Sequence, residues 1–379
     1  MRKSSLRKLG VFLLIAILSA CIRPSNTISP FVKPADHKED LQITVANQQH
    51  EPVNGPDFII IPDAELVFSP SCVGFEVEDF VASMGGFLAS YSEEIEGELL
   101  SGGQIVSSIS REYSVNPRML LALLEYQSGW VVEQEPAYQG EYPLGYHDSW
   151  HKGLFRQLSF IANEMNRGYY LHSVKALSQL TLMDTQVVYL SEELNGGTAA
   201  LQYLFGLLKN YYDWELSVSP LGVSAVYMKL FGSPSQFDID PIVPQGLSQP
   251  AFQLPFAEGE IWYFTGGPHS GWGNGAAWAA LDFAPPGEQF GCYESDDWVL
   301  AVADGQVVCS ENGAVVLDLD NDGYEQTGWT VLYMHIAEKD RVVMGAVLKA
   351  GERIGHPSCE GGPATGTHVH IARRYNGEW

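Results

Sequence analysis

Five polar residues of the types that bind metal ions lie in the last third of this 379-residue chain, in a stretch that is otherwise apolar and rich in glycine. They are His269, Asp282, His335, His368 and His370. On a β-strand, residues i and i+2 point to the same face, so His368 and His370 can both address one metal ion. The same spacing also occurs as two surface histidines on a strand, so this pair alone does not establish a site.

The number and type of these residues suit hydrolysis assisted by zinc. Catalytic zinc keeps three protein ligands and leaves a fourth position for water, whose pKa falls toward neutrality on the metal. Five candidates are enough for three ligands and two further histidines. Those two could transfer protons, because a neutral imidazole titrates near physiological pH.

The order of motifs over residues 259–379 resembles that of the LytM/lysostaphin-type zinc endopeptidases of bacterial cell walls, metallopeptidase family twenty-three. The counterparts here are His269 with Asp282, Ala303-Asp304-Gly305-Gln306-Val307, Tyr333-Met334-His335, Gly351-Glu352-Arg353-Ile354-Gly355 and His368-Val369-His370. The resemblance implies an all-β antiparallel domain of the duplicated hybrid type. It also implies that His269, Asp282 and His370 hold zinc. His335 and His368 would then orient or deprotonate water and stabilise the oxyanion.

The first pair of ligands departs from the family pattern. The two residues are normally four positions apart, but His269 and Asp282 are separated by thirteen. Residues 270–275 therefore indicate an inserted loop, which could form a flap over the groove or a plain surface turn. Asp282 keeps a suitable apolar context, so we retain both residues as ligands.

Short β runs with turn signals must position these side chains. They cover residues 298–303, 306–309, 314–319, 330–335 and 368–372, a pattern typical of an all-β domain. A Pro-bearing linker over 236–258 precedes this domain.

A second metal site is suggested by Asp318, Asp320 and Asp322, which alternate and are followed by Gly323 as at the start of a calcium loop. Position twelve is Trp329 instead of a bidentate glutamate, so only Glu325 or backbone oxygens could complete the shell. A solvated acidic hairpin is the alternative.

Residues 79–235 carry helical periods and predict a mainly α domain. The clearest helix follows Asn116 as N-cap, has Pro117 in its first turn and ends at Gly129. Further helices are expected near 153–170 and 195–208. Together with the residues that follow Gly153 and Leu194, this stretch resembles the lysozyme-like fold of soluble lytic transglycosylases.

The catalytic acid of that family is missing. Its helix ends in Glu-Ser, whereas this chain has Gln127-Ser128, and an amide cannot protonate a glycosidic oxygen. Glu125 lies about 200° around the helix and should face elsewhere. We expect no transglycosylase activity, with Glu133 or Glu135 as the alternative acid. The nearby aromatic residues could stack on sugars or belong to the core: Trp130, Tyr138, Tyr142, Tyr146 and Trp150.

The N-terminus reads as an export signal, with four basic residues followed by an apolar run over 9–20 that is too short for a mature membrane span. Its end, Leu18-Ser19-Ala20-Cys21, resembles the bacterial lipobox. We expect residues 1–20 to be removed, Cys21 to be acylated and residues 21–78 to form a Pro-rich tether.

Cys72, Cys292, Cys309 and Cys359 remain in an oxidising compartment and allow three pairings. We favour Cys292 with Cys359, since both lie in loops near the expected site and Cys309 lies in a strand pattern. Free buried thiols are the alternative.

The net charge of the chain limits the classes of partner that it can bind. The formal net charge of -25 argues against nucleic acid, whose binding requires basic surface. The sequence thus predicts an extracytoplasmic, lipid-anchored zinc endopeptidase that cuts peptide bonds of peptidoglycan, targeted by a degenerate lysozyme-like domain. A non-catalytic wall-binding or amidase-activating scaffold is the alternative, and a lytic transglycosylase is a second.

Overall fold

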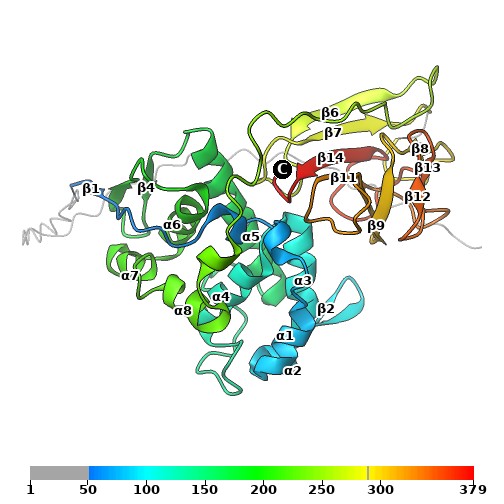
Figure 1. Cartoon of the computed structure of the whole chain (residues 1–379). Helices are drawn as coiled ribbons and strands as arrows, with labels where there is room; N and C mark the ends of the chain where they lie inside the picture. The colour runs from blue at the N-terminus through cyan, green and yellow to red at the C-terminus, as the bar shows by residue number, and fades with distance from the viewer. Residues whose placement is uncertain (1–50, 288–289) are drawn as a thin grey trace, which may run out of the picture. The chain divides into compact units, whose positions relative to one another are not determined.

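The computed structural model describes residues 51–287 and 290–379 (Figure 1). The predicted signal sequence and Cys21 lie outside these residues. Within the described part of the chain, no helix is both long and apolar enough to cross a bilayer. The described residues form a helical region, which we define as residues 53–237, and a β-sheet region, residues 263–379.

The helical region is built mainly of α-helices around one apolar core. Its α-helices are α1 (Val77–Met84), α2 (Phe87–Ser90), α3 (Gly102–Tyr113), α4 (Pro117–Ser128), α5 (Leu154–Ser173), α6 (Gly196–Leu208), α7 (Tyr211–Ser217) and α8 (Val223–Phe231). Short 3-10 helices are η1 (Asp63–Glu65), η2 (Pro70–Cys72) and η3 (Pro234–Phe237). Its strands are β1 (Val53–Asn54), β4 (Gln179–Thr181) and β5 (Val187–Tyr189), which form one sheet, and the hairpin β2 (Ser92–Ile95) and β3 (Glu98–Ser101).

The boundaries of α4 follow from its sequence. The Asn116 side chain accepts a hydrogen bond from the Arg118 N–H, Pro117 occupies the first turn, and Gly129 ends the helix in the left-handed conformation that glycine adopts readily. The helices α5 and α6 likewise lie where the periodicity places them.

The predicted tether is wrong for residues 53–78, which belong to the helical region. Ile60, Ile61, Leu66 and Val67 are all at most 3% exposed and belong to the core of the helical region. The prolines of this segment therefore shape turns on a packed surface and do not indicate a free linker. The apolar residues between those prolines indicate that the segment is packed, although its high proline content is typical of a linker.

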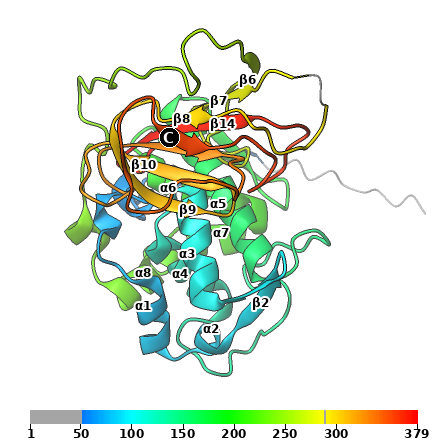
Figure 2. The same cartoon turned by 90° about the vertical axis from the view of Figure 1, so that its right-hand side faces the viewer.

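The β-sheet region contains a seven-stranded antiparallel sheet in the order β12-β9-β10-β11-β14-β7-β6. These strands are β6 (Tyr263–His269), β7 (Ala280–Ala284), β9 (Gly305–Glu311), β10 (Ala314–Asp318), β11 (Trp329–Met334), β12 (Val347–Leu348) and β14 (Val369–Tyr375). A smaller pair consists of β8 (Val299–Leu300) and β13 (Arg353–Gly355). In Figure 2 the strands of the large sheet lie above and partly in front of the helices.

The two faces of this sheet differ, because side chains alternate along each strand. Val331, Tyr333 and Val369 belong to the larger apolar cluster. Leu332 and Ala372 belong to a smaller cluster of buried side chains on the opposite face, and Trp272 and Trp379 pack against this smaller cluster. The second face is the one turned toward α3 and α5, as the hydrogen bonds from Trp379 to the Tyr113 carbonyl and the Tyr170 hydroxyl show.

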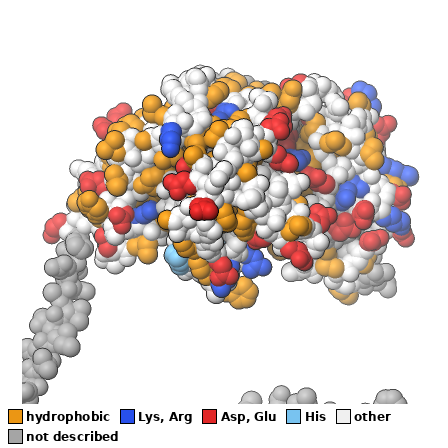
Figure 3. Space-filling model, turned by 90° about the horizontal axis from the view of Figure 1, so that it is seen from below, with side chains coloured by type: hydrophobic (Ala, Val, Ile, Leu, Met, Phe, Trp, Pro, Cys, Tyr) orange, Lys and Arg blue, Asp and Glu red, His pale blue; other side chains and the backbone are white. Residues whose placement is uncertain are grey.

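The surface carries the acidic excess of the sequence. On the side shown in Figure 3, red acidic side chains are dispersed among neutral and hydrophobic ones, with blue basic side chains scattered between them. This side presents a mixed surface and not a continuous basic one.

Candidate metal centre

Three neighbouring strands bring His269, Asp282 and His370 together. His269 ends β6, Asp282 lies in β7, and His370 lies in β14 directly opposite Asp282. One potential ligand atom from each residue lies within 4.8 Å of the others. The His269 Nε2 and Asp282 Oδ2 atoms are 2.9 Å apart, and His370 Nδ1 lies 3.3 Å from Asp282 Oδ1.

The unusual spacing of thirteen is absorbed by a loop between β6 and β7. This β6–β7 loop, residues 270–279, leaves the sheet after His269 and returns at Ala280, which pairs with His269. Register shifts within β6 place Gly266 opposite Asp282. A Cβ atom at Gly266 would lie 2.7 Å from Asp282 Oδ2, so glycine leaves room for the carboxylate.

The donor set fits a zinc ion. Two imidazoles and one carboxylate are typical zinc ligands in hydrolytic sites. His269 Nε2 and Asp282 Oδ1 are buried polar atoms without a hydrogen-bond partner among the described residues, although the two side chains are in contact. Buried polar atoms are normally satisfied, so these two are suited to a cation between them.

Backbone carbonyls fix which nitrogen of the His269 and His370 imidazoles faces the centre of the cluster. His370 Nε2 lies 3.0 Å from the Gly271 carbonyl, and His269 Nδ1 lies 3.1 Å from the Ser270 carbonyl. A carbonyl only accepts, so these nitrogens carry the protons. His370 Nδ1 and His269 Nε2 therefore keep their lone pairs for a metal, as ligand histidines do when the other nitrogen is held.

Asp282 is held as an anion. Its burial by itself would raise the pKa, but the adjacent imidazoles of His370 and His269 outweigh that effect and lower the pKa to about 2. The carboxylate is therefore ionised over the whole physiological range.

His335 and His368 lie beside the three clustered residues. Their rings are 4.5 Å apart, and His368 Nε2 lies 3.9 Å from Asp282 Oδ2. His335 Nδ1 contacts the Glu360 carbonyl and His368 Nδ1 contacts the Gly366 carbonyl, each at 2.8 Å. In both rings Nε2 is thus the nitrogen with a lone pair, which is the state required of a general base.

Two features distinguish His335 from an ordinary histidine. Burial, reinforced by the neighbouring His368 and His370, lowers its pKa to about 4 although the Glu360 carbonyl opposes the shift. Its backbone has a φ of 65°, in the left-handed region that non-glycine residues seldom adopt. Strained backbone of this kind is concentrated at functional sites.

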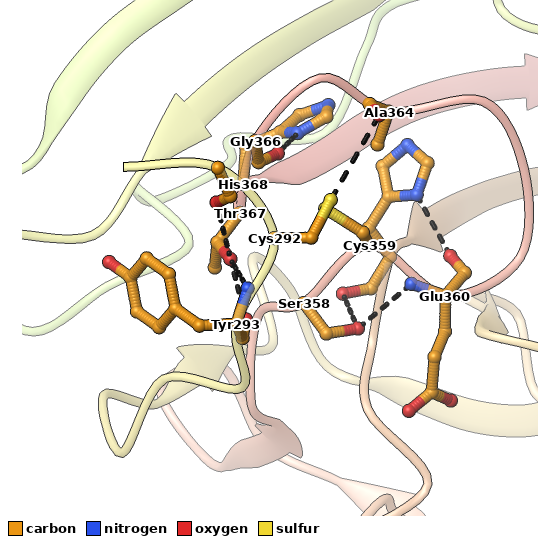
Figure 4. Close-up of a disulfide and its surroundings, with 11 residues drawn as sticks. Cys292, Tyr293, Ser358, Cys359, Glu360, Ala364, Gly366, Thr367 and His368 are labelled. Carbon is orange, nitrogen blue, oxygen red and sulfur yellow. Dashed lines mark hydrogen bonds between the residues drawn. A yellow bond between two sulfur atoms is a disulfide. The ribbon is translucent and has the colours of Figure 1, made fainter. Parts of the chain in front are cut away.

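A disulfide joins the segments behind these two histidines (Figure 4). Cys292 and Cys359 are bonded, whereas Cys72 and Cys309 are free and buried. Tyr293 donates its N–H to Thr367 Oγ1 next to His368, and Glu360, which follows Cys359, holds His335. The disulfide therefore connects the supports of both rings.

The acidic loop assembles only its three aspartates. Ligand atoms of Asp318, Asp320 and Asp322 lie within 4.8 Å of one another, and burial together with Asp318 raises the pKa of Asp320 to about 6. Asp318 accepts N–H groups of its own loop, from Asp320 and Gly323. Calcium at this loop stays a prediction.

Glu325, one of the groups named to complete a calcium shell, is engaged elsewhere. It accepts from Arg111 at 2.7 Å and from Arg374 at 2.9 Å, and this contact joins α3 to β14. That leaves backbone oxygens as the remaining candidates for the calcium shell.

The helical region contains no glutamate at the end of α4. Gln127 donates to the Leu144 carbonyl and accepts from Lys209 Nζ at 2.9 Å. Glu125 faces away from it and accepts the N–H groups of Val131 and Val132. Glu133 and Glu135 are exposed.

The aromatic residues near α4 divide between core and surface. Trp130 is 1% exposed and donates to the Tyr138 carbonyl, so it is a core residue. The ring of Tyr146 stacks on that of Phe160, with their centroids 3.6 Å apart. Tyr142 is partly buried and contacts His147. Tyr138 and Trp150 are exposed, which leaves them as the surface aromatics available to a glycan.

Sequence reasoning missed the supporting groups because most are backbone atoms. The carbonyls of Gly271, Glu360 and Gly366 orient three imidazoles. No residue type is required to provide a carbonyl, so only the local density of glycine near the histidines could have pointed to them.

Comparisons with known proteins match both regions. The family model described as "LasA, N-terminal domain" matches residues 59–245, which include most of the helical region. The chain is 27% identical to protease LasA of Pseudomonas aeruginosa over 352 residues, covering 86% of this chain and 74% of that protein. It is also 27% identical to the β-lytic metalloendopeptidase of Achromobacter lyticus over 146 residues, 36% of each chain.

Solved structures are similar to a smaller part of the chain. The M23 metalloprotease pseudoalterin, described as from the deep sea, is 24% identical, with coverage of 35% of this chain and 74% of that one and a TM-score of 0.29. The catalytic domain of lysostaphin from Staphylococcus simulans is 25% identical, with coverage of 31% and 81% and a TM-score of 0.22. The chain is therefore similar to protease LasA over most of its length and to a β-lytic metalloendopeptidase over 146 residues, and the metal-binding residue types of its β-sheet region gather on three strands.

Proposed function

We propose that this protein is a zinc endopeptidase that hydrolyses peptide bonds in the stems or cross-bridges of peptidoglycan. The observation that carries the proposal is the convergence of His269, Asp282 and His370 beside two further histidines with available Nε2 atoms. The name of the Achromobacter relative, a β-lytic metalloendopeptidase, supports the same reaction class.

The protein groups divide the work by their protonation states. Zn²⁺ held by the three residues would supply a Lewis acid for the scissile carbonyl and a water of lowered pKa. His335 is neutral and its Nε2 can accept the proton of the attacking water. The Nε2 lone pair of His368, 3.9 Å from Asp282 Oδ2, can orient the attacking water, and the proton that His335 takes up can pass to the leaving amine.

We further propose that the protein works outside the cytoplasm, attached to a bacterial membrane through a lipid on Cys21. The sequence of residues 1–21 is the basis for the lipid. The Cys292–Cys359 disulfide supports an oxidising compartment, where such bonds persist. The helical region is proposed to position the enzyme on its polymeric substrate without catalysing, because Gln127 cannot serve as an acid.

The test is mass spectrometry of fragments released when residues 22–379 are incubated with purified peptidoglycan, with and without a zinc chelator. New peptide termini that disappear on chelation, and that are absent with Asp282→Ala, support the proposal. His147→Ala is the matched control, since His147 is exposed and lies outside the metal centre.

Two other outcomes contradict the proposal. Anhydro sugars on intact peptides would transfer catalysis to the helical region, and would require an acid other than Gln127. Binding to peptidoglycan without release of fragments, and without stoichiometric zinc, would indicate a scaffold.

A further inference from the structure

The β6–β7 loop connects one of the clustered histidines to the helical region. The Gly271 carbonyl of this loop accepts the hydrogen bond from His370 Nε2 at 3.0 Å. That bond orients the His370 ring so that Nδ1 faces the centre that it shares with Asp282, whose Oδ1 lies 3.3 Å away. The position of the Gly271 carbonyl therefore sets the orientation of His370.

The loop itself has few internal bonds to hold that carbonyl in place. Its own contacts are Gly271 N–H to the Ala277 carbonyl, Ser270 Oγ to the Ala276 carbonyl and a turn between Ala277 and Ala279. It contains three glycines, which give the backbone more conformational freedom than other residues do. A rigid carbonyl in such a segment requires support from outside.

Helix α5 supplies that support at Asn274, near the tip of the loop. Asn163 accepts the N–H groups of Asn274 and Gly275 at 3.0 and 2.9 Å, and donates from Nδ2 to Asn274 Oδ1 at 2.8 Å. Arg167 donates from Nη2 to the same Asn274 oxygen at 2.6 Å. Glu164 accepts from Arg167 Nε and so fixes the arginine.

The approach between α5 and the loop is close enough to require glycine. A Cβ atom at Gly275 would lie 2.0 Å from the Asn163 carbonyl oxygen, and one at Gly273 would lie 2.6 Å from Asn163 Oδ1. Gly273 also has a φ of +58°. The tip is thus seated on the backbone of α5 and not merely near it.

The loop is held on its other side as well. Trp272 packs edge-on against Tyr113 of α3, with ring centroids 6.3 Å apart. A Cβ atom at Gly271 would lie 2.3 Å from the ring of Trp379, which donates to the Tyr113 carbonyl. The Gly271 carbonyl therefore lies in a segment confined between the two helices and the sheet.

We infer that Asn163 and Arg167 of the helical region are positioning residues for the metal centre. By holding Asn274 they hold the β6–β7 loop, and through the Gly271 carbonyl they orient His370 for metal binding. The inference rests on the proposed function, since it assumes that His370 is a ligand. It adds that two residues of α5, more than 100 positions before the β6–β7 loop in the sequence, complete the site.

The experiment measures metal binding directly, using the full chain from residue 22. Zn²⁺ dissociation constants are obtained by competition with a chromophoric chelator, and the Co²⁺ form is examined by its visible absorption. We expect Asn163→Ala and Arg167→Ala each to weaken Zn²⁺ binding about tenfold, as losing an outer-shell partner does. The Co²⁺ bands should change shape, because the ligand geometry changes.

Two further variants separate positioning from general damage. Ser114→Ala removes a hydrogen bond to the Gly377 carbonyl in the same contact between regions without touching the loop, and should leave the dissociation constant and the Co²⁺ spectrum unchanged. Arg167→Lys keeps a cationic donor and should restore most of the affinity lost in Arg167→Ala. Hydrogen exchange over residues 270–277 of the metal-free protein should increase in Asn163→Ala and remain at the wild-type rate in Ser114→Ala.

The outcomes distinguish this inference from the proposed function. A wild-type protein that binds no stoichiometric Zn²⁺ would overturn both. Stoichiometric binding by the wild type, with unchanged or tighter binding by folded Asn163→Ala and Arg167→Ala, would overturn the inference alone. If Asn163→Ala does not fold, Asn163→Ser is the replacement and the same criteria apply.

Discussion

Asp282 and His370 are direct cross-strand neighbours on β7 and β14, and their Oδ1 and Nδ1 atoms lie 3.3 Å apart. The pairing of two adjacent strands thus sets the separation of two groups that are distant in sequence. Cross-strand neighbours of an antiparallel pair have Cβ atoms about 5 Å apart, a separation that one metal ion can bridge.

Replacing Asp282 by asparagine removes the only charge among the three clustered residues while preserving its shape. We expect Asp282→Asn to lose stoichiometric zinc and to reduce hydrolysis by more than the roughly 10- to 100-fold typical of an outer-shell change. Metal content by mass spectrometry and peptide release from peptidoglycan check this. An active, zinc-loaded Asp282→Asn protein would remove Asp282 from the ligand set.

Replacing His335 should separate catalysis from metal binding. His335 lies beside the three clustered residues and contacts the Glu360 carbonyl. We expect His335→Gln to bind zinc with wild-type stoichiometry and to lower kcat by about 10²- to 10⁴-fold, as loss of a general base does. Parallel zinc titrations and steady-state assays check this, and loss of zinc in this variant would assign His335 to the ligands instead.

Removing the disulfide should loosen both proton-handling histidines. The double variant Cys292→Ser/Cys359→Ser loses the link between the segments that carry Tyr293 and Glu360. We expect the free energy of unfolding to fall by about 2–4 kcal/mol and kcat to fall with zinc retained. Urea unfolding and activity assays check this. Cys309→Ser serves as the control, since Cys309 is a free buried thiol.

Glu378 should make stability fall as pH rises. Burial, together with the charge of Asp63, raises its pKa to about 7, while a hydrogen bond from Tyr169 opposes the shift. The folded state therefore binds this proton more tightly than the unfolded state, and stability is lost between about pH 4.5 and pH 7.

Glu378→Gln tests that dependence. At pH 8 we expect the variant to be more stable than the wild type by on the order of 2 kcal/mol, and at pH 4 the two should be equal. Urea unfolding at both pH values checks this, with the exposed Glu258→Gln as the control. A difference that does not depend on pH would mean that burial of Glu378 is not responsible.

The strands and helices that carry the site could be predicted from sequence because their signals are local. The spacing of His368 and His370 requires only the period of a strand, and α4 requires only Asn116, Pro117 and Gly129. The long spacing of His269 and Asp282 departs from the family pattern. The β6–β7 loop accommodates it, because the residues at both ends of the loop stay paired in the sheet.

Contacts between distant segments could not be predicted in this way. The Gly271 and Glu360 carbonyls belong to the backbone, and their partners depend on how the loops close. Glu325 was considered as a metal ligand because it follows the acidic loop, but two arginines from different regions hold it. Residues 60–67 read as tether because prolines surround them, although their apolar residues reach a core formed elsewhere in the chain.

The face of the sheet that carries His370 is completed by the helices. Trp272 and Trp379 pack on its small apolar cluster, and Tyr113 and Tyr170 contact them from α3 and α5. A β-sheet region released from the helices would present two indole rings and the buried Arg374 to water. Its solubility would decline, and other apolar surfaces would compete for that face.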